Sequence, residues 1–261
     1  MKCKSLLLVL LLVVPGCTEP SVEDDRTILA TTTSMRDSGL LDILLPAFSD
    51  STGVEIDFVA VGTGAALNLG KSGDADVLIV HSPEREQDFI EEGHGISRHT
   101  FAWNRFVILS PSNDPVGMND DIVESLTKIA ESETCFVSRG DDSGTHTKEL
   151  ELWNLTGIIP EGDWYLSIGQ GMSAAITMAD EKDCYTLSDI GTHLNRDDTD
   201  LIHHEFEHNS TLNPYSIVLI EGEHFDETKQ LKDFLFGEGK SIIENYTING
   251  QTVFNTTQPV H

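Results

Sequence analysis

The chain has 261 residues, and its 44 acidic against 16 basic side chains give a formal net charge of -28. A protein that binds nucleic acid by neutralising phosphates cannot carry such an excess of negative charge, so this class is excluded. With 39% hydrophobic and 23% charged residues, the composition is that of a folded protein, and the length allows one large or two small domains.

The first 26 residues carry the features of an export signal. Two lysines precede an apolar run over residues 6–14, and Cys17 follows where a lipoprotein signal would be cleaved. We therefore expect residues 1–16 to be a signal peptide and residues 17–26 a polar tether, with Cys17 as a lipid anchor on the outer face of the cell membrane. Pro15 departs from the small residue usual at its position, so secretion with Cys17 unlipidated stays open.

Cleavage of the signal and use of Cys17 as an anchor would leave a single cysteine pair, Cys135 and Cys184. Each begins a short apolar run, so neighbouring parallel strands could bring the two together in a compartment that permits disulfides. A disulfide and two buried thiols fit the sequence equally well. Four N-x-S/T sequons also agree with an extracellular chain: Asn154, Asn209, Asn245 and Asn255.

Strands and helices are expected to alternate along the rest of the chain. Thr27–Thr32 is β-branched and apolar, which predicts a buried strand, and apolar residues at helical spacing over 38–48 predict a helix. The same order recurs, with strands over 54–61, 76–80, 106–109, 135–137 and 184–187, and helices from 64, over 83–92, 121–131 and 143–154, and near 189. Repeated units of this kind imply a mostly parallel sheet with helices on both faces, which binds ligands at the carboxyl ends of its strands.

Three of the turns after these strands are rich in hydroxyls and glycines: 31–34, 62–64 and 138–145. Free N–H groups and the positive dipole end of a helix attract anions, glycine lets the backbone approach closely, and hydroxyls add donors. Any one of these turns would be explained as a helix cap. Three in one chain, one of them containing Arg139, favour an oxyanion site.

A function of a different class was also considered, an extracellular metal-binding or hydrolytic protein. His203, His204 and His208 could ligate a divalent metal. Ser143 with His146 suggests a hydrolase, but the surrounding residues do not form the G-x-S-x-G elbow, and residues on one helical turn seldom converge as nucleophile and base. We therefore expect neither a metal site nor an enzyme.

Seven stretches of the chain together resemble the tungstate-binding proteins of ABC-type tungstate importers. They are Thr31–Ser34, Val61–Gly64, Gly73–Val77, His81–Pro83, Ser138–His146, Gly169–Met172 and Tyr185–Leu187. The resemblance implies an α/β fold like the type II periplasmic binding proteins, with two lobes of mixed, mostly parallel sheets joined by two crossover strands. It places the lobes at 27–107 with 215–261 and at 108–214, the crossings near 106–109 and 215–220, and a last helix over 226–246 on the first lobe.

The resemblance also implies the site and the function. The anion would be held by Thr33, Ser34, Thr63, Arg139, Ser143, Gly144 and Thr145. Asp141, by resemblance to phosphate-binding proteins, would orient Arg139, and a lesser part would fall to Gly64, Ser138, Gly171 and Met172. The protein would be a monomer without a cofactor that captures tungstate, or molybdate, and delivers it to a membrane permease and its ATPase.

The residues after the third strand bear on the choice among oxyanions. Phosphate near neutral pH keeps a proton and benefits from a carboxylate acceptor, whereas tungstate, molybdate and sulfate only accept hydrogen bonds. His81 and Ser82 stand where that acceptor would be needed, which disfavours phosphate; a phosphate- or sulfate-type protein is the alternative within this class. Because the negative net charge opposes anion capture, we expect a salt-rich setting that screens it.

Overall fold

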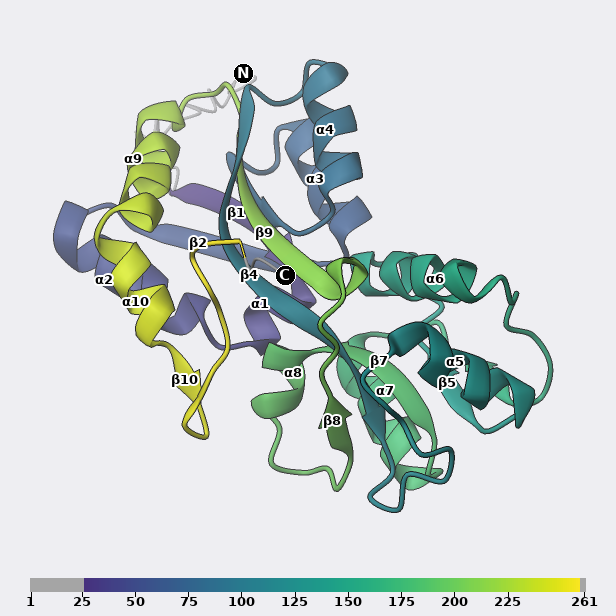
Figure 1. The fold of residues 1–261 in the computed structure, drawn as a ribbon. Coiled ribbons are helices and arrows are strands. Elements are labelled where there is room, and N and C mark those ends of the chain that lie inside the picture. Colours follow the sequence, from purple (N-terminus) through teal and green to yellow (C-terminus); the bar gives the residue numbers. More distant parts are fainter. Residues whose placement is uncertain (1–25, 259–261) are drawn as a thin grey trace, which may run out of the picture.

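A computed structural model describes residues 26–258 and divides them into two lobes (Figure 1). The first lobe holds β1 (Thr27–Thr32), α1 (Thr33–Asp37), α2 (Leu41–Thr52), β2 (Ile56–Val61), α3 (Thr63–Ser72), β3 (Val77–Val80), α4 (Pro83–Glu91), α9 (Phe225–Phe236) and α10 (Glu238–Asn245). The second holds α5 (Ile122–Glu131), β5 (Phe136–Ser138), α6 (Gly144–Thr156), β6 (Tyr165–Ser167), α7 (Met172–Glu181), β7 (Tyr185–Asp189), α8 (Ile190–Leu194), β8 (Ile202–His204) and a 3-10 turn over Asn209–Thr211.

Two long strands, β4 (Ser97–Ser110) and β9 (Leu212–Leu219), join the lobes. The strand order is β2-β1-β3-β9-β4-β7-β5-β6, with β8 also paired to β4. β4 pairs with β9 up to Arg105 and with β7 from Phe106 onward, so one continuous strand belongs to both halves of the sheet. The strands on either side of this pair run parallel to their neighbours, β2-β1-β3 in the first lobe and β7-β5-β6 in the second. The expected fold class is therefore confirmed.

Helices cover both faces of the sheet in each lobe, and the central strands β1, β3, β5 and β7 are buried along almost their whole length. In the first lobe α2, α9 and α10 pack on one face, and α3 and α4 on the other (Figure 1). In the second lobe α5 and α6 cover the face that carries Phe136 and Tyr185, while α7 covers the face that carries Val137. Alternate residues of one strand thus enter different cores, and this two-sided packing fixes the strand register.

The structure differs from the sequence-based expectation in several places. The strand expected over 106–109 is only the end of β4, whose first half is too polar to stand out as a buried strand. The short strands β6 and β8 were not expected at all. The single helix expected over 226–246 is wrong, because the chain breaks at Gly237 into α9 and α10.

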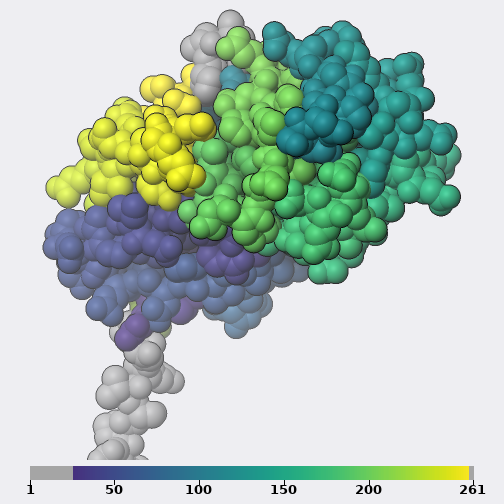
Figure 2. Space-filling model, turned by 90° about the horizontal axis from the view of Figure 1, so that it is seen from below, coloured from purple at the N-terminus to yellow at the C-terminus, as the bar shows by residue number. Residues whose placement is uncertain are grey.

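The C-terminal segment over residues 246–256 lies across the junction of the lobes. It forms the hairpin of β10 (Thr247–Ile248) and β11 (Gln251–Thr252), and Asn255 then exchanges two backbone hydrogen bonds of 2.8 Å with Trp103 of β4. The Asn249 side chain donates to the Leu194 carbonyl in the second lobe at 3.2 Å. In Figure 2 this segment, in yellow, lies against both the purple-blue and the green parts of the surface. We call residues 246–256 the C-terminal strap.

Cys135 and Cys184 form a disulfide, which decides between the two alternatives that the sequence left open. β5 pairs in parallel with β7 through Phe136 and Tyr185, so the two cysteines that precede these residues face one another with Cα atoms 4.7 Å apart. Cys17 and the expected signal peptide and tether up to residue 25 lie outside the described residues. Among residues 26–258, no helix is both long and apolar enough to cross a bilayer.

The disulfide closes a loop with a sequence separation of 49 residues, so it restricts the unfolded chain substantially. We predict that replacing both Cys135 and Cys184 by Ala lowers the free energy of unfolding by about 2–4 kcal/mol. Urea denaturation of the native and double-variant proteins would measure this difference. Dithiothreitol should destabilise the native protein and leave the variant unchanged; an equal response of the two would contradict the prediction.

Candidate functional site

The first-lobe part of the site is built at the carboxyl end of β1. Thr32 caps α1 by accepting from the Met35 N–H at 3.3 Å, so the helix begins at Thr33. Ser34 is 2% exposed, and its Oγ lies 3.1 Å from Thr32 Oγ1 and 3.0 Å from His81 Nε2. Ser34 is therefore buried against the residue that follows β3, which is the neighbour of β1 in the sheet.

His81 connects this turn to the crossover strands. Its Nδ1 lies 2.8 Å from Oδ1 of Asn213, and its ring stacks at a tilt on Tyr215, 5.0 Å between centroids. Burial lowers the pKa of His81 to about 4, so the imidazole is neutral at pH 7. The sequence marked His81 as a residue at the carboxyl end of a strand, but not its partner Asn213, which lies 132 positions away.

The two lobes meet where Thr63 faces Gly144. A Cβ added at Gly144 would lie 3.1 Å from Thr63 Oγ1 and 3.3 Å from His81 Cε1, so only glycine allows this approach without displacing a neighbour. Thr63 is 1% exposed, and within residues 26–258 its hydroxyl has no hydrogen-bond partner. A buried hydroxyl without a partner is unusual in a folded protein and points to a ligand. Arg85 also bridges the lobes, donating to the Asp142 carbonyl at 3.3 Å.

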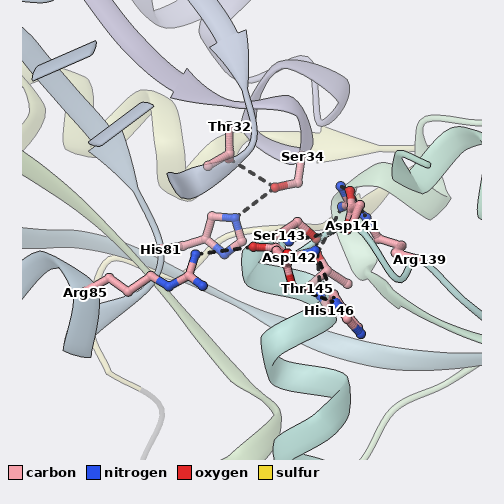
Figure 3. A network of polar contacts seen from close by, with 10 residues as sticks. All are labelled: Thr32, Ser34, His81, Arg85, Arg139, Asp141, Asp142, Ser143, Thr145 and His146. Atoms are coloured by element: carbon pink, nitrogen blue, oxygen red, sulfur yellow. Dashed lines mark hydrogen bonds and ion pairs between the residues drawn. The ribbon is translucent and has the colours of Figure 1, made fainter. Parts of the chain in front are cut away.

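The second-lobe part is the turn between β5 and α6. Ser143 caps α6 by accepting from the His146 N–H, so Gly144 and Thr145 form the first turn of the helix. Arg139 is 4% exposed, and its Nε and Nη2 donate to Asp141 Oδ2 at 3.2 and 2.6 Å. Figure 3 shows this turn facing Ser34 and His81 across the lobe boundary.

Asp141 holds Arg139 in place. Its second oxygen accepts from the Ser143 N–H at 3.3 Å, so both carboxylate oxygens are engaged within the turn. Burial alone would raise the pKa of Asp141, but hydrogen bonds from Arg139 and Ser143 outweigh it and lower the pKa. Arg139 also donates through Nη1 to Thr145 Oγ1 at 3.4 Å. Of its five N–H groups, three are thereby used, and two remain for another acceptor.

The four residues expected to play a lesser part in the site lie in different surroundings. Gly64 lies within the first turn of α3, and Ser138 is buried at the end of β5. Gly171 is exposed and the Met172 side chain lies in the core, so only the backbone of this pair can face the site. That backbone is close to it, because the Gln170 N–H donates to the Arg139 carbonyl at 3.1 Å.

The side chains that suggested a metal site or a hydrolase are not arranged for either. His204 bonds to Ser110, His208 bonds to Ser210, and His203 packs edge to face against His193. No group of three or more His, Cys, Asp or Glu among residues 26–258 is placed to hold a metal ion. Nδ1 of His146 lies 3.2 Å from the Asp142 N–H, while Ser143 Oγ accepts from the His146 backbone.

Glu149 is a buried carboxyl on α6 that the sequence did not single out. It is 3% exposed, and its Oε1 accepts from the Tyr165 hydroxyl at 2.6 Å. Among the described residues no cation lies within 4.0 Å of it. Burial raises the pKa of Glu149 to about 7, which the hydrogen bond from Tyr165 only partly offsets.

This shift predicts how stability depends on pH. The folded protein holds the Glu149 proton more tightly than the unfolded chain, so the carboxyl lowers stability as pH rises from 4.5 to about 7. Glu149→Gln keeps the acceptor for Tyr165 and removes the ionisation. We expect the variant to be more stable than the native protein at pH 8 by up to about 3 kcal/mol, and equally stable at pH 4.5.

Urea denaturation at pH 4.5 and pH 8 measures the difference in the free energy of unfolding between Glu149→Gln and the native protein. Glu151→Gln, on an exposed part of the same helix, is the matched control and should change stability little at either pH. A constant difference between Glu149→Gln and the native protein across this range would show that the carboxyl does not titrate there.

Comparison with known proteins places this geometry in a family. A model described as a PBP superfamily domain matches residues 18–236. The tungstate-binding protein TupA of Peptoclostridium acidaminophilum is 49% identical over 201 residues, which are 72% of this chain and 70% of that protein.

Two solved structures are also similar. One, described as the tungstate ABC transporter from Geobacter sulfurreducens, has a TM-score of 0.78 and 43% identity and covers 85% of this chain and 99% of its own. The tungstate-binding protein TupA from Desulfovibrio alaskensis G20 has a TM-score of 0.78 and 34% identity over 89% of this chain and 99% of its own. Since identity and coverage are both high, the chain belongs to the PBP superfamily and, within it, to the family of the tungstate-binding proteins.

Proposed function

We propose that this protein binds tungstate, or the closely similar molybdate, between its lobes and delivers it to an ABC importer. The observation that carries the proposal is the meeting of Thr63 and Gly144, which places a buried, unpartnered hydroxyl beside the first turn of α6. Arg139 lies in the same turn with two N–H groups to spare. Relatives named as tungstate-binding proteins support the choice of ligand.

The anion would be held entirely by donors. Thr63 with the backbone and side chains of Thr33 and Ser34 would contribute from the first lobe, and Arg139 with the turn over 143–145 from the second. Gly64, Ser138 and the backbone at 171–172 would support this shell. Asp141 would keep Arg139 oriented without meeting the anion, since both its oxygens are engaged.

Each lobe alone would satisfy only part of a tetrahedral dianion. Closing the lobes completes the donor set, expels water and strengthens each remaining contact, because hydrogen bonds to a charge are stronger where water is excluded. Function in this scheme depends on binding and lobe movement and requires no cofactor or chemical step.

Transport implies partners outside the chain. The closed form would dock on a permease driven by an ATPase. We propose that the protein works as a monomer, exported to the outer face of the cell membrane and held there by lipid on Cys17.

The first test titrates residues 27–261 with tungstate, molybdate, sulfate and phosphate. Tryptophan fluorescence at low and high salt measures the binding. We expect saturable binding of tungstate, molybdate equal or weaker, and no binding of phosphate. Preference for phosphate would contradict both the family-based ligand and the argument from His81.

Substitution of the arginine tests its role as a direct ligand. Arg139→Ala should weaken tungstate binding about 30-fold or more, because a charge-assisted, desolvated contact is lost and Asp141 is left unpaired. Ser34→Ala should lose less, about tenfold, since a single hydroxyl is removed. Equal losses in calorimetry would instead make Arg139 a structural residue.

Closure of the two lobes can be tested by a substitution at Gly144. Gly144→Ala adds a methyl group 3.1 Å from Thr63 Oγ1, so the lobes cannot approach fully, and we expect about tenfold weaker tungstate binding. Gly222→Ala is the matched control, because its added Cβ meets nothing within 4 Å and the residue lies outside the proposed site. Unchanged affinity of Gly144→Ala would mean that the lobes need not close this tightly.

A further inference from the structure

A buried chain of hydrogen bonds runs from the proposed anion site to the crossover strands. Beyond the contacts of Ser34 with His81 and of His81 with Asn213, Asn213 Nδ2 lies 2.8 Å from Asn104 Oδ1 and 3.0 Å from the Tyr215 hydroxyl. His81 is 6% exposed, and the asparagines and Tyr215 are at most 2% exposed. Figure 3 shows the site end of this chain, where Ser34 lies between Thr32 and His81.

The direction of these hydrogen bonds is set by Asn104, at the end of the chain that lies away from the proposed anion site. Asn104 turns its Nδ2 toward the buried carboxylate of Asp189 at 3.5 Å, which leaves its Oδ1 for Asn213. Asn213 gives its N–H groups to Asn104 and Tyr215, so it presents only oxygen to His81. The neutral imidazole has one N–H, and that proton must therefore be on Nδ1.

This direction conflicts with anion binding at Ser34. With Nδ1 protonated, Nε2 is an acceptor and takes the hydroxyl proton of Ser34 at 3.0 Å. Ser34 has only one proton, so its oxygen would then turn a lone pair toward an oxyanion that itself only accepts. Ser34 can donate to the anion only if Nε2 carries a proton and donates to Ser34.

We propose that His81 is a positioning residue for anion capture, and that with the oxyanion bound its proton lies on Nε2 and no longer on Nδ1. Nε2–H then donates to Ser34 Oγ, and the Ser34 hydroxyl donates to the anion. The inference rests on the proposed function, and it adds a residue that acts on the ligand through Ser34.

The surroundings of His81 allow this exchange. If the side-chain amide of Asn213 turns over, its Nδ2–H faces Nδ1 of His81. The Asn213 Oδ1 then takes the position that Nδ2 held, and the Tyr215 hydroxyl can donate to it. Asn104 turns with it and gives up two long contacts of its Nδ2, to Asp189 and to the Tyr215 hydroxyl, both 3.5 Å. Burial, and to a smaller extent the Arg139 and Lys148 cations, lowers the pKa of His81 and disfavours a positive charge on the imidazole.

Nuclear magnetic resonance of protein labelled with ¹⁵N in its ten histidines can test this directly. The His81 resonances are assigned by their loss in His81→Phe, and spectra are compared without and with sodium tungstate at pH 7. We expect Nδ1 to be the protonated nitrogen without tungstate and Nε2 with it. An Nε2 that stays unprotonated, or a ring protonated on both nitrogens, would overturn the proposal.

A double-mutant cycle on tungstate affinity tests whether His81 acts through Ser34. His81→Phe should weaken binding about tenfold in the native protein and less than twofold when Ser34 is already Ala. His99→Phe, a histidine of β4 bonded to Ser97, is the matched control and should have no effect in either background. A merely structural His81 would give equal losses in both backgrounds, which refutes the proposal; failure of the native protein to bind tungstate would instead refute the proposed function.

Discussion

The pairing of β4 with β9 is the constraint on which the two-lobed architecture depends. It runs from Ser97 to Arg105 on one strand, and β4 then continues into the second lobe without a break. Both lobes are therefore built on the same strand, so a change in their relative orientation must bend this pair. The C-terminal strap adds a third connection through Asn255 and Asn249. These connections hold the lobes beside one another, with Thr63 facing Gly144.

Electrostatics explains how a strongly acidic chain can hold an anion. The net charge of -28 acts at long range and is screened by salt, whereas the donors of the proposed site are buried and would contact the anion directly. Among the described residues, Asp141 is the only carboxylate that pairs with Arg139, and it is fully engaged by that arginine and by the Ser143 N–H. Local donors thus decide the affinity, and distant carboxylates act mainly on the approach of the ligand.

Much of the fold could be predicted because the signals were local. β1 coincides with its predicted range, and α4, α5 and α6 lie within two residues of theirs, since apolar periodicity and capping residues such as Asp121 and Ser143 fix helices along the sequence. The first half of β4 was not predicted because it is partly exposed. The break at Gly237 was not predicted because a helical pattern tolerates an isolated glycine. Partners distant in sequence, Asn213 for His81 and Tyr165 for Glu149, have no local signature. The assignment of individual anion ligands stays a prediction, although the structure brings the three predicted turns together.

The closeness of Thr63 to Gly144 has a kinetic consequence. An anion enclosed beneath this contact would dissociate only when the lobes part. The lifetime of the complex would then depend on interlobe contacts such as Arg85 with Asp142 and Asn195 with Asp37, 3.3 and 2.9 Å long, as well as on the bonds to the anion. A receiving partner that opens the lobes would therefore accelerate release of the anion.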